Sequence, residues 1–326
     1  MIARRLVLAA ALATPRLARS QPVRRRPVVC YLALGTEEAD GPYIAALREG
    51  LRAQGLVESR NLTIELRYAH GEGDSARRII QDMAALPADV FVAPGPTAAR
   101  AIRRLTSIPV VAVGLPSVPA DPELFASLAR PGGSVTGFST FGEELSSKRL
   151  DLILEMLPAT RVIGILHNMS AITLDGWGSR TEAAAAARGL HALRLPVSSA
   201  SGTEIASGLQ RLKSQGATAI IVVRDFLTTT RRNDILAAAA QARLAVIAEQ
   251  RLFAQEGALF TYGANLPDLF RRAAEYVARI LRGERAGELP VQLPTAVELV
   301  LNLRTARMLD LAVPATILAR ADEVIE

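Results

Sequence analysis

The chain has 326 residues, and its 38 lysines and arginines exceed its 32 acidic residues to give a formal net charge of +6. This excess lies at the N-terminus, because residues 1–26 hold seven arginines and no acid, and 31 basic and 32 acidic residues remain in 27–326. The body of the protein is therefore near neutral, which argues against a basic nucleic-acid-binding surface. A single cysteine, Cys30, excludes an internal disulfide and a metal site built from several cysteines.

The first twenty residues have the pattern of an export signal. A pair of arginines precedes the apolar run 6–14, and small residues stand at the −3 and −1 positions of a cleavage site after Ser20. The run is far shorter than the roughly 20 residues that a membrane-spanning helix needs. We predict a signal peptide at 1–20, a disordered arginine-rich tail at 21–26 and a periplasmic protein. The alternative is an ordinary amphipathic helix, which would usually carry acids.

From residue 27 onward, apolar runs alternate with amphipathic stretches. The run 28–34 is apolar throughout, which is typical of a strand buried on both faces, and 43–54 has helical spacing and stops at a glycine. The pattern as far as residue 139 predicts strands at 28–34, 62–68, 90–93, 110–113 and 135–139, with helices at 43–54, 75–86 and 97–105.

The same rhythm then starts again. It predicts helices at 145–157, 181–189, 204–214, 233–242 and 266–282, with strands at 162–166, 192–197, 219–223, 245–248 and 259–262. Two runs of alternating strands and helices indicate an α/β protein with two Rossmann-like lobes and parallel sheets. The remainder, 283–326, is too short for a third domain, and we expect it to cross back between the lobes.

Open parallel sheets bind ligands at the carboxyl ends of their strands, so the residues after each strand are the candidates for a binding site. At 94–97 a strand ends in a Pro-Gly-Pro turn, and Thr97 is expected to be the N-cap of the next helix. Free N–H groups there favour an anion such as a carboxylate, although plain capping would look the same. After a later strand, Arg224 and Asp225 could clamp a carboxylate and an amine, or form a surface ion pair. Asn168 follows its strand in the same way.

Few other residues suggest chemistry. The three histidines, His70, His167 and His191, lack the spacing of metal ligands, and no serine-nucleophile elbow or complete dinucleotide fingerprint is present. We therefore expect no enzymatic activity and no cofactor. Three arginine pairs are expected on solvated helix faces: Arg103-Arg104, Arg231-Arg232 and Arg271-Arg272.

Four long phrases carry a resemblance to a known family: 127–137 (SLARPGGSVTG), 55–65 (GLVESRNLTIE), 262–274 with its Tyr-Gly start, and 298–325. Together they resemble the ABC-transporter substrate-binding proteins that include tryptophan- and tyrosine-type binders. The resemblance implies a type I periplasmic binding fold, in which three crossings join two lobes that close on a small ligand. It also implies a membrane permease, coupled to an ATPase, as the partner.

The resemblance also implies lobe boundaries and a site. The N-terminal lobe would comprise 27–139 plus about 264–292, and the C-terminal lobe 140–263 plus about 293–326. The family commonly has Asp-Pro after the fourth strand, where this chain has Val118-Pro119. An Asp121-Pro122 pair stands further along the chain, and whether it replaces the acid that would hold a ligand amine stays open. The expected ligand-binding residues are Gly35, Gly95, Thr97, Ala98, Gly114, Asn168, Asp225, Phe226 and Glu249.

We therefore predict a monomeric solute-binding protein of an ABC importer, closing on a carboxylate-bearing ligand such as an amino acid or an aromatic acid derivative. An enzyme of two α/β lobes would need a nucleotide-phosphate loop or an acid pair. A transcription factor of this fold would need an N-terminal DNA-binding unit, for which the first strand leaves no room. An exported sensing module that signals to a receptor stays open as an alternative.

Overall fold

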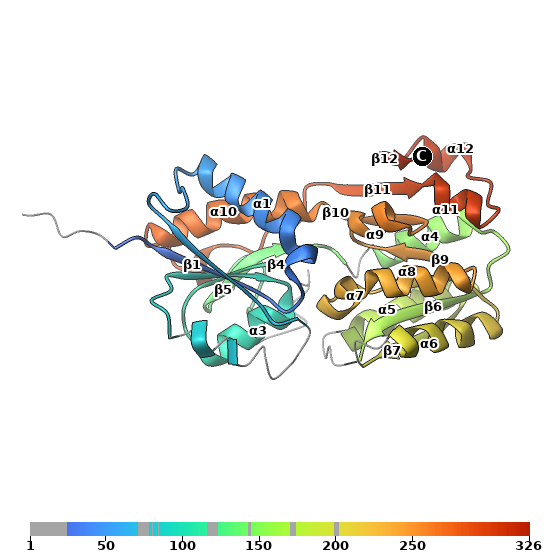
Figure 1. Ribbon diagram of the computed structural model, residues 1–326, viewed down its shortest axis with the longest axis horizontal. Coiled ribbons are helices and arrows are strands. Elements are labelled where there is room, and N and C mark those ends of the chain that lie inside the picture. Colours follow the sequence, from blue (N-terminus) through green and yellow to red (C-terminus); the bar gives the residue numbers. More distant parts are fainter. Residues whose placement is uncertain are drawn as a thin grey trace, which may run out of the picture.

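The computed structural model describes residues 25–70, 78–79, 81–83, 85–115, 123–142, 145–169, 174–198 and 202–326. Two open sheets, each flanked by helices, form two lobes side by side (Figure 1). This arrangement confirms the predicted α/β fold with two Rossmann-like lobes. The expected signal peptide and most of the arginine-rich tail lie outside the described residues, and within the described ranges no helix is both long and apolar enough to cross a membrane.

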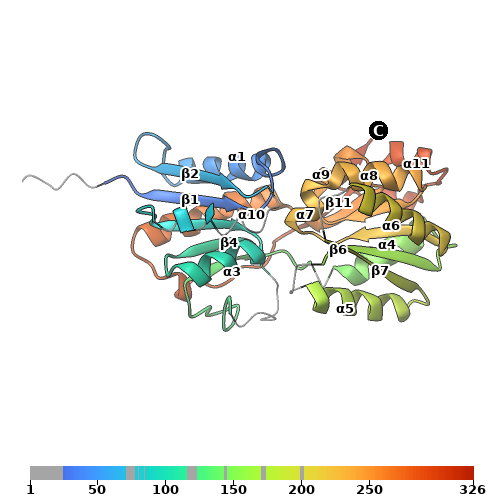
Figure 2. The ribbon, with the colours of Figure 1, turned by 60° about the horizontal axis from the view of Figure 1, so that its bottom comes forward.

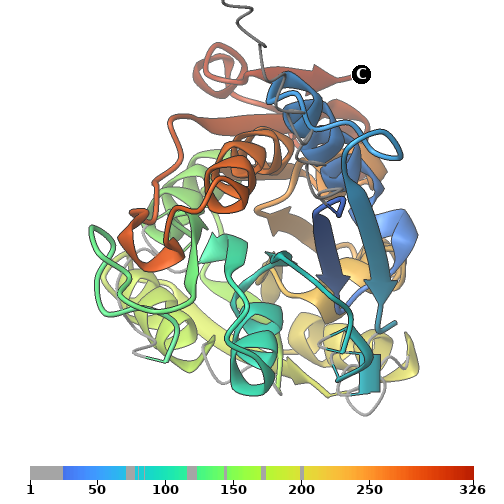
Figure 3. The ribbon, with the colours of Figure 1, turned by 90° about the vertical axis from the view of Figure 1, so that its left-hand side faces the viewer.

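The first lobe contains a five-stranded parallel sheet in the order β2-β1-β3-β4-β5. Helix α10, which is distant in sequence, packs beside α1 on one face of this sheet (Figures 1 and 3). Gly50 permits the contact, because a Cβ there would lie 2.2 Å from the carbonyl oxygen of Arg271. The elements are β1 Val28–Ala33, α1 Glu37–Ala53, β2 Thr63–Tyr68, β3 Val90–Pro94, α3 Pro96–Leu105, β4 Val110–Leu115, β5 Val135–Ser139 and α10 Leu266–Leu281.

The second lobe contains a seven-stranded sheet in the order β12-β11-β10-β9-β8-β6-β7. Strand β11 runs antiparallel to β10, whereas the other described strand pairs are parallel, so this sheet departs in one pair from the prediction. Its strands are β6 Val162–Asn168, β7 His191–Val197, β8 Ala217–Val222, β9 Ala245–Ala248, β10 Phe260–Ala264, β11 Val297–Asn302 and β12 Glu323–Ile325. Its helices are α4 Ser146–Met156, α5 Leu174–Ala186, α6 Gly202–Ser214, α7 Phe226–Thr230, α8 Arg232–Gln241, α9 Arg251–Glu256, α11 Leu303–Met308 and α12 Ala315–Leu318.

The chain passes between the lobes after β5, between β10 and α10, and between residues 292 and 297. Before the last passage, a short 3-10 helix, Ala286–Glu288, and the residues after it bind to the first lobe. There Thr136 Oγ1 donates to Leu289 O at 2.6 Å, and Ser139 N donates to Gln292 O at 2.8 Å. The antiparallel direction of β11 follows, because the chain returns to the second sheet from the opposite side. The residues after β11 then complete the second lobe, where Ile317 is buried in its core.

Both faces of each sheet are covered by a core of aliphatic side chains. Strand β1 shows the pattern, because Val29 and Tyr31 belong to one core of the first lobe and Cys30 and Leu32 to the other. The prediction that this strand is buried on both faces is therefore confirmed. Rigid cores on both sides fix the strand ends, and the candidate site is built there.

Candidate functional site

The candidate site lies where the carboxyl ends of the two sheets face each other. Figure 2 shows α7 at the boundary between the two lobes. Arg224, which follows β8, extends into the first lobe, where its Nη2 donates to the carbonyl oxygen of Gly114 at 3.0 Å. A Cβ at Gly114 would lie 2.3 Å from the same nitrogen, and a Cβ at Gly35 would lie 3.2 Å from Thr230 Oγ1. The absence of side chains at these two glycines therefore lets the lobes meet.

Glu249, a buried residue of this site, lies between two arginines. Its Oε2 is 3.8 Å from Arg224 Nε, and its Oε1 is 3.5 Å from Nη1 of the fully buried Arg149. Arg149 also donates to the carbonyl oxygens of Tyr262 and Gly142, each at 2.8 Å, and burial lowers its pKa. Within the described residues, Arg224 Nε and Arg149 Nη2 are buried without a hydrogen-bond acceptor. The site therefore holds more donors than its own acceptors satisfy.

Asn168 and Asp225 form a second polar pair. Asn168 Nδ2 donates to Asp225 Oδ1 at 2.6 Å, and the same oxygen accepts from the backbone N–H of Leu227 at 2.9 Å. Asp225 is the N-cap of α7, in a capping box with Thr228. Burial raises the pKa of Asp225, whereas its hydrogen bonds and Arg224 oppose that rise. One function of Asp225 in this structure is thus to anchor α7 and orient Asn168.

Phe226, the first residue of α7, contacts both lobes. Its half-buried ring packs against one core of the second lobe and against one core of the first. It therefore lies at the boundary between the lobes, and its predicted contact with a ligand stays a prediction.

The predicted capping role of Thr97 is wrong. Helix α3 begins at Pro96, its N-cap is Gly95, and no side chain caps it. Proline suits the first helical position because its fixed φ matches the helix, and Gly95 has a φ of 107° that only glycine adopts readily. Thr97 is half-buried at the second helical position, and the Ala98 methyl is buried in the core. The proposed anion site at the start of α3 stays a prediction.

Sequence reasoning missed Asp40, because the predicted helix began after Pro42 whereas α1 begins at Glu37. Asp40 is buried and lines a 40 Å³ cavity between the lobes, together with Gly35, Arg224 and Thr230. A signal was present, since residues 40, 44, 47 and 51 share one stripe of a helix and the last three are apolar.

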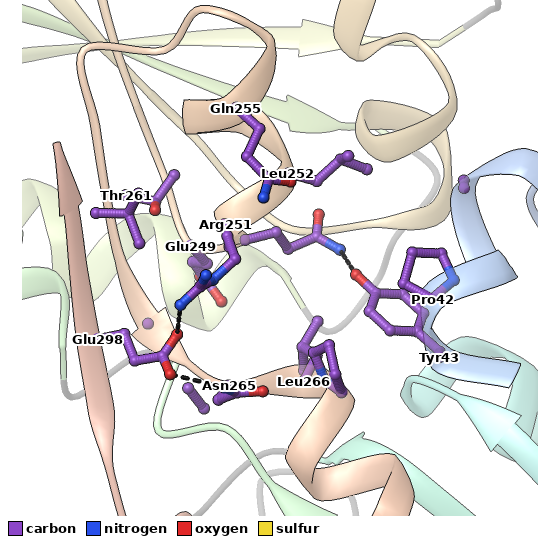
Figure 4. Close-up of a pocket in the computed structure, with 16 residues that line it drawn as sticks. Pro42, Tyr43, Glu249, Arg251, Leu252, Gln255, Thr261, Asn265, Leu266 and Glu298 are labelled. Atoms are coloured by element: carbon purple, nitrogen blue, oxygen red, sulfur yellow. Dashed lines mark hydrogen bonds and ion pairs between the residues drawn. The ribbon is translucent and has the colours of Figure 1, made fainter. Parts of the chain in front are cut away.

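A larger cavity of 250 Å³ lies beside the crossings, between α1, α9, β10, β11 and the start of α10 (Figure 4). Its wall is fixed by Glu298, which accepts from Arg251 Nη2 at 3.0 Å and from Asn265 Nδ2 at 2.6 Å. Gln250 Nε2 donates to the Tyr43 hydroxyl at 2.8 Å, and both residues also line the 40 Å³ cavity. This bond between the lobes therefore lies where the two cavities adjoin.

Two searches against known sequences give consistent results. A family model described as ABC transporter substrate binding protein matches residues 40–325. A tyrosine-binding protein of Clostridioides difficile is 23% identical over 284 residues, which is 84% of this chain and 77% of that protein.

Solved structures with the same fold cover nearly the whole chain. A conserved domain protein from Vibrio cholerae has a TM-score of 0.85 at 25% identity, over 92% of this chain and 100% of that one. An ABC domain from Streptococcus pneumonia in complex with L-Trp has a TM-score of 0.82 at 21% identity, over 91% and 100% of the two chains. The ligand-free, open structure of a substrate-binding protein from Clostridium difficile has a lower TM-score of 0.65 at 21% identity, over 92% and 99%.

Proposed function

This chain belongs to the family of ABC transporter substrate-binding proteins, and we propose that it is the extracytoplasmic solute-binding protein of an ABC importer. It closes its two lobes on a small carboxylate-bearing ligand, an amino acid or an aromatic acid derivative. The similarity to a tyrosine-binding protein and to a structure with bound L-Trp supports this class of ligand. Its partners are the ligand and a membrane permease. Export through residues 1–20, a monomeric state and movement of the two lobes as units are parts of the same proposal.

The observation that carries the proposal is the position of Arg224. Its guanidinium bridges the two lobes at Gly114, is only 16% exposed and keeps Nε without a hydrogen-bond acceptor among the described residues. A planar guanidinium binds carboxylates more selectively than an ammonium does, because its donors match the two oxygens. We assign Gly35, Gly95, Gly114, Asn168, Asp225, Phe226 and Glu249 to the surrounding site, with Thr97 and Ala98 at the start of α3.

In this proposal, the two lobes close through ligand binding, without a covalent step. A ligand that contacts both lobes stabilises the closed form by its difference in affinity for the closed and open forms. The bonds Arg224–Gly114 and Gln250–Tyr43 join the lobes in this structure and would add to that stabilisation. The permease then distinguishes the closed shape from the open one.

The proposal is tested by thermal unfolding and calorimetry with L-tyrosine, L-tryptophan and aromatic carboxylates. A ligand that binds only the folded protein at 100 times its Kd adds about 2.7 kcal/mol to the free energy of unfolding, so the Tm should rise. Arg224→Gln should weaken binding at least tenfold, whereas Arg104→Gln, a change in an exposed arginine of α3, should not. If none of these acids raises the Tm, or if Arg224→Gln binds them normally, the ligand class is wrong.

Import is tested in the source organism. Deletion of the gene should abolish uptake of the radiolabelled ligand, and the wild-type gene should restore it. A gene without residues 1–20 should fail to restore uptake while still producing protein that binds the ligand. Normal uptake after deletion would contradict the importer role.

A further inference from the structure

Among the described residues, one acidic side chain in the cleft forms no ion pair or side-chain hydrogen bond. Asp40 is 7% exposed, and no described side chain or backbone group forms a hydrogen bond or an ion pair with its carboxylate. The other acids at the start of α1 differ: Glu37 is exposed, and Glu38 forms an ion pair with Arg232 at 2.8 Å. A buried carboxylate without a partner is costly, so its retention at a site between lobes suggests a partner that arrives with the ligand.

Three phenols are near Asp40, and Arg224 lines the same cavity. Tyr31 on β1, Tyr43 on α1 and Tyr68 on β2 all interact electrostatically with it. Tyr31 and Tyr68 have buried hydroxyls without a hydrogen-bond partner in the described chain. The charges that act on these phenols are Glu37 and Arg48 near Tyr68, and Arg224 and Arg232 near Tyr43. Burial is the cause that raises the pKa of Asp40.

The cavity beside Asp40 fits a small polar head group. Its volume of 40 Å³ exceeds the roughly 10–15 Å³ that a cavity needs to hold one water molecule, so an ammonium group fits. Thr230 of the second lobe lines the same cavity, and its Oγ1 is buried without a hydrogen-bond partner among the described residues. Arg224 lines the same cavity. An anion, a hydroxyl and a guanidinium from two lobes thus surround one small space.

Resting on the proposed function, we propose that Asp40 binds a protonated amine of the ligand, assisted by Thr230, while Arg224 binds the carboxylate. The ligand is then a zwitterion, and an aromatic acid without an amine is a poor ligand. An ammonium has three N–H donors, which Asp40 and the Thr230 hydroxyl can accept. Because the two acceptors come from different lobes, the amine would also favour closure.

The proposal predicts proton release on binding. Burial raises the pKa of Asp40 to about 7, so near neutral pH about half of the ligand-free molecules carry this proton. An adjacent ammonium favours the ionised carboxylate and lowers that pKa, so binding expels the proton. At about pH 8.5, Asp40 is already ionised and little release remains.

The experiment is isothermal titration of the full chain with L-tyrosine and L-tryptophan at pH 7, in two buffers with different ionisation enthalpies. The wild type should release about half a proton per ligand, and Asp40→Asn should release none and bind at least about tenfold more weakly. Thr230→Val should give a smaller loss of affinity. The matched control is Glu37→Gln, an exposed acid of the same helix, which should bind and release protons as the wild type does.

A ligand without the amine, 3-(4-hydroxyphenyl)propanoate, separates the two proposals. It should bind weakly, and equally so to the wild type and to Asp40→Asn. If it binds as tightly as L-tyrosine, or if Asp40→Asn keeps the affinity and the proton release, the role of Asp40 is overturned and the carboxylate-binding function stands. If the wild type binds none of the three compounds, both proposals fail.

Discussion

At the residue scale, Asp40 should make stability depend on pH even without ligand. Burial raises its pKa from the ordinary 3.8 to about 7, so the folded protein retains a proton that the unfolded chain loses in between. The free energy of unfolding therefore falls as pH rises from about 4 to 7 and then levels off, with an upper limit of roughly 4 kcal/mol for this group.

Urea denaturation of wild type and Asp40→Asn across this range measures that effect. We expect Asp40→Asn to gain stability relative to the wild type as the pH rises from 4 to 8. Two curves that stay parallel over this range would show that the carboxylate is ionised at no cost.

A second residue-scale prediction concerns Arg149, whose guanidinium binds two backbone carbonyls and neighbours Glu249. Arg149→Met should lower the free energy of unfolding by about 3–5 kcal/mol, because it leaves buried acceptors and a buried charge with fewer partners. Arg149→Lys should recover only part of this, since an ammonium does not reproduce the planar fork. Denaturant titration of both variants measures the difference. A loss below about 1 kcal/mol for Arg149→Met would show that these hydrogen bonds contribute little to the stability of the fold.

At the element scale, the proposed site predicts that helix capping at α7 and ligand binding share Asp225. Asp225→Ala removes the N-cap and the acceptor for Asn168, and should cost about 1 kcal/mol of stability together with ligand affinity. Asp225→Ser should keep most of the cap while losing the bond to Asn168, so its stability should recover more than its affinity. Thermal unfolding and calorimetry on both variants separate the two roles. If stability and ligand affinity recovered equally in Asp225→Ser, the two separate roles of Asp225 would be contradicted.

The helices and strands also show which parts of the fold could be predicted from the sequence. Most strand positions were predicted closely because the buried runs are apolar, as in β9 at Ala245–Ala248. Helices α7 and α9, of 5 and 6 residues, were missed because they are shorter than two helical turns and show no period. The expectation that Arg231-Arg232 is solvated is wrong for Arg232, whose side chain is 4% exposed.

The site was harder to predict than the fold for a physical reason. Residues at or just after the carboxyl ends of strands, such as Asn168, Asp225 and Glu249, could be placed from the topology of parallel sheets alone. Arg149 and Asp40 lie within helices, where burial of a charge depends on which neighbours from the other elements surround it. The antiparallel β11 likewise depends on the path of the chain between the lobes.

At the scale of the whole molecule, Arg232 joins the lobes. Its Nη2 donates to Glu38 of the first lobe at 2.8 Å, and its Nε donates to Glu256 of its own lobe at 2.7 Å. Glu38 is mostly exposed, so this pair should contribute less than about 1 kcal/mol, and salt should screen it.

Glu38→Gln should therefore shift the ligand-free protein slightly toward the open form. We expect a larger radius of gyration by small-angle X-ray scattering at low salt, a few-fold weaker ligand affinity, and no difference at high salt. Glu37→Gln is the matched control. A difference that persists unchanged in high salt would mean that the ion pair is not its cause.

The packing of α10 on α1 has a consequence for how the chain reaches this shape. The first lobe is unfinished until residues 266–281 are available, more than 200 residues after α1, so its core depends on contacts of long range in sequence. Such contacts slow folding, because the chain must lose the entropy of closing a long loop before the contacts can stabilise the lobe. A fragment that ends at residue 265 would leave the apolar face of α1 uncovered and should be prone to aggregation. The first lobe of a nascent chain should therefore stay unfolded until synthesis is nearly complete, a state in which that part of the chain can still pass through a narrow channel.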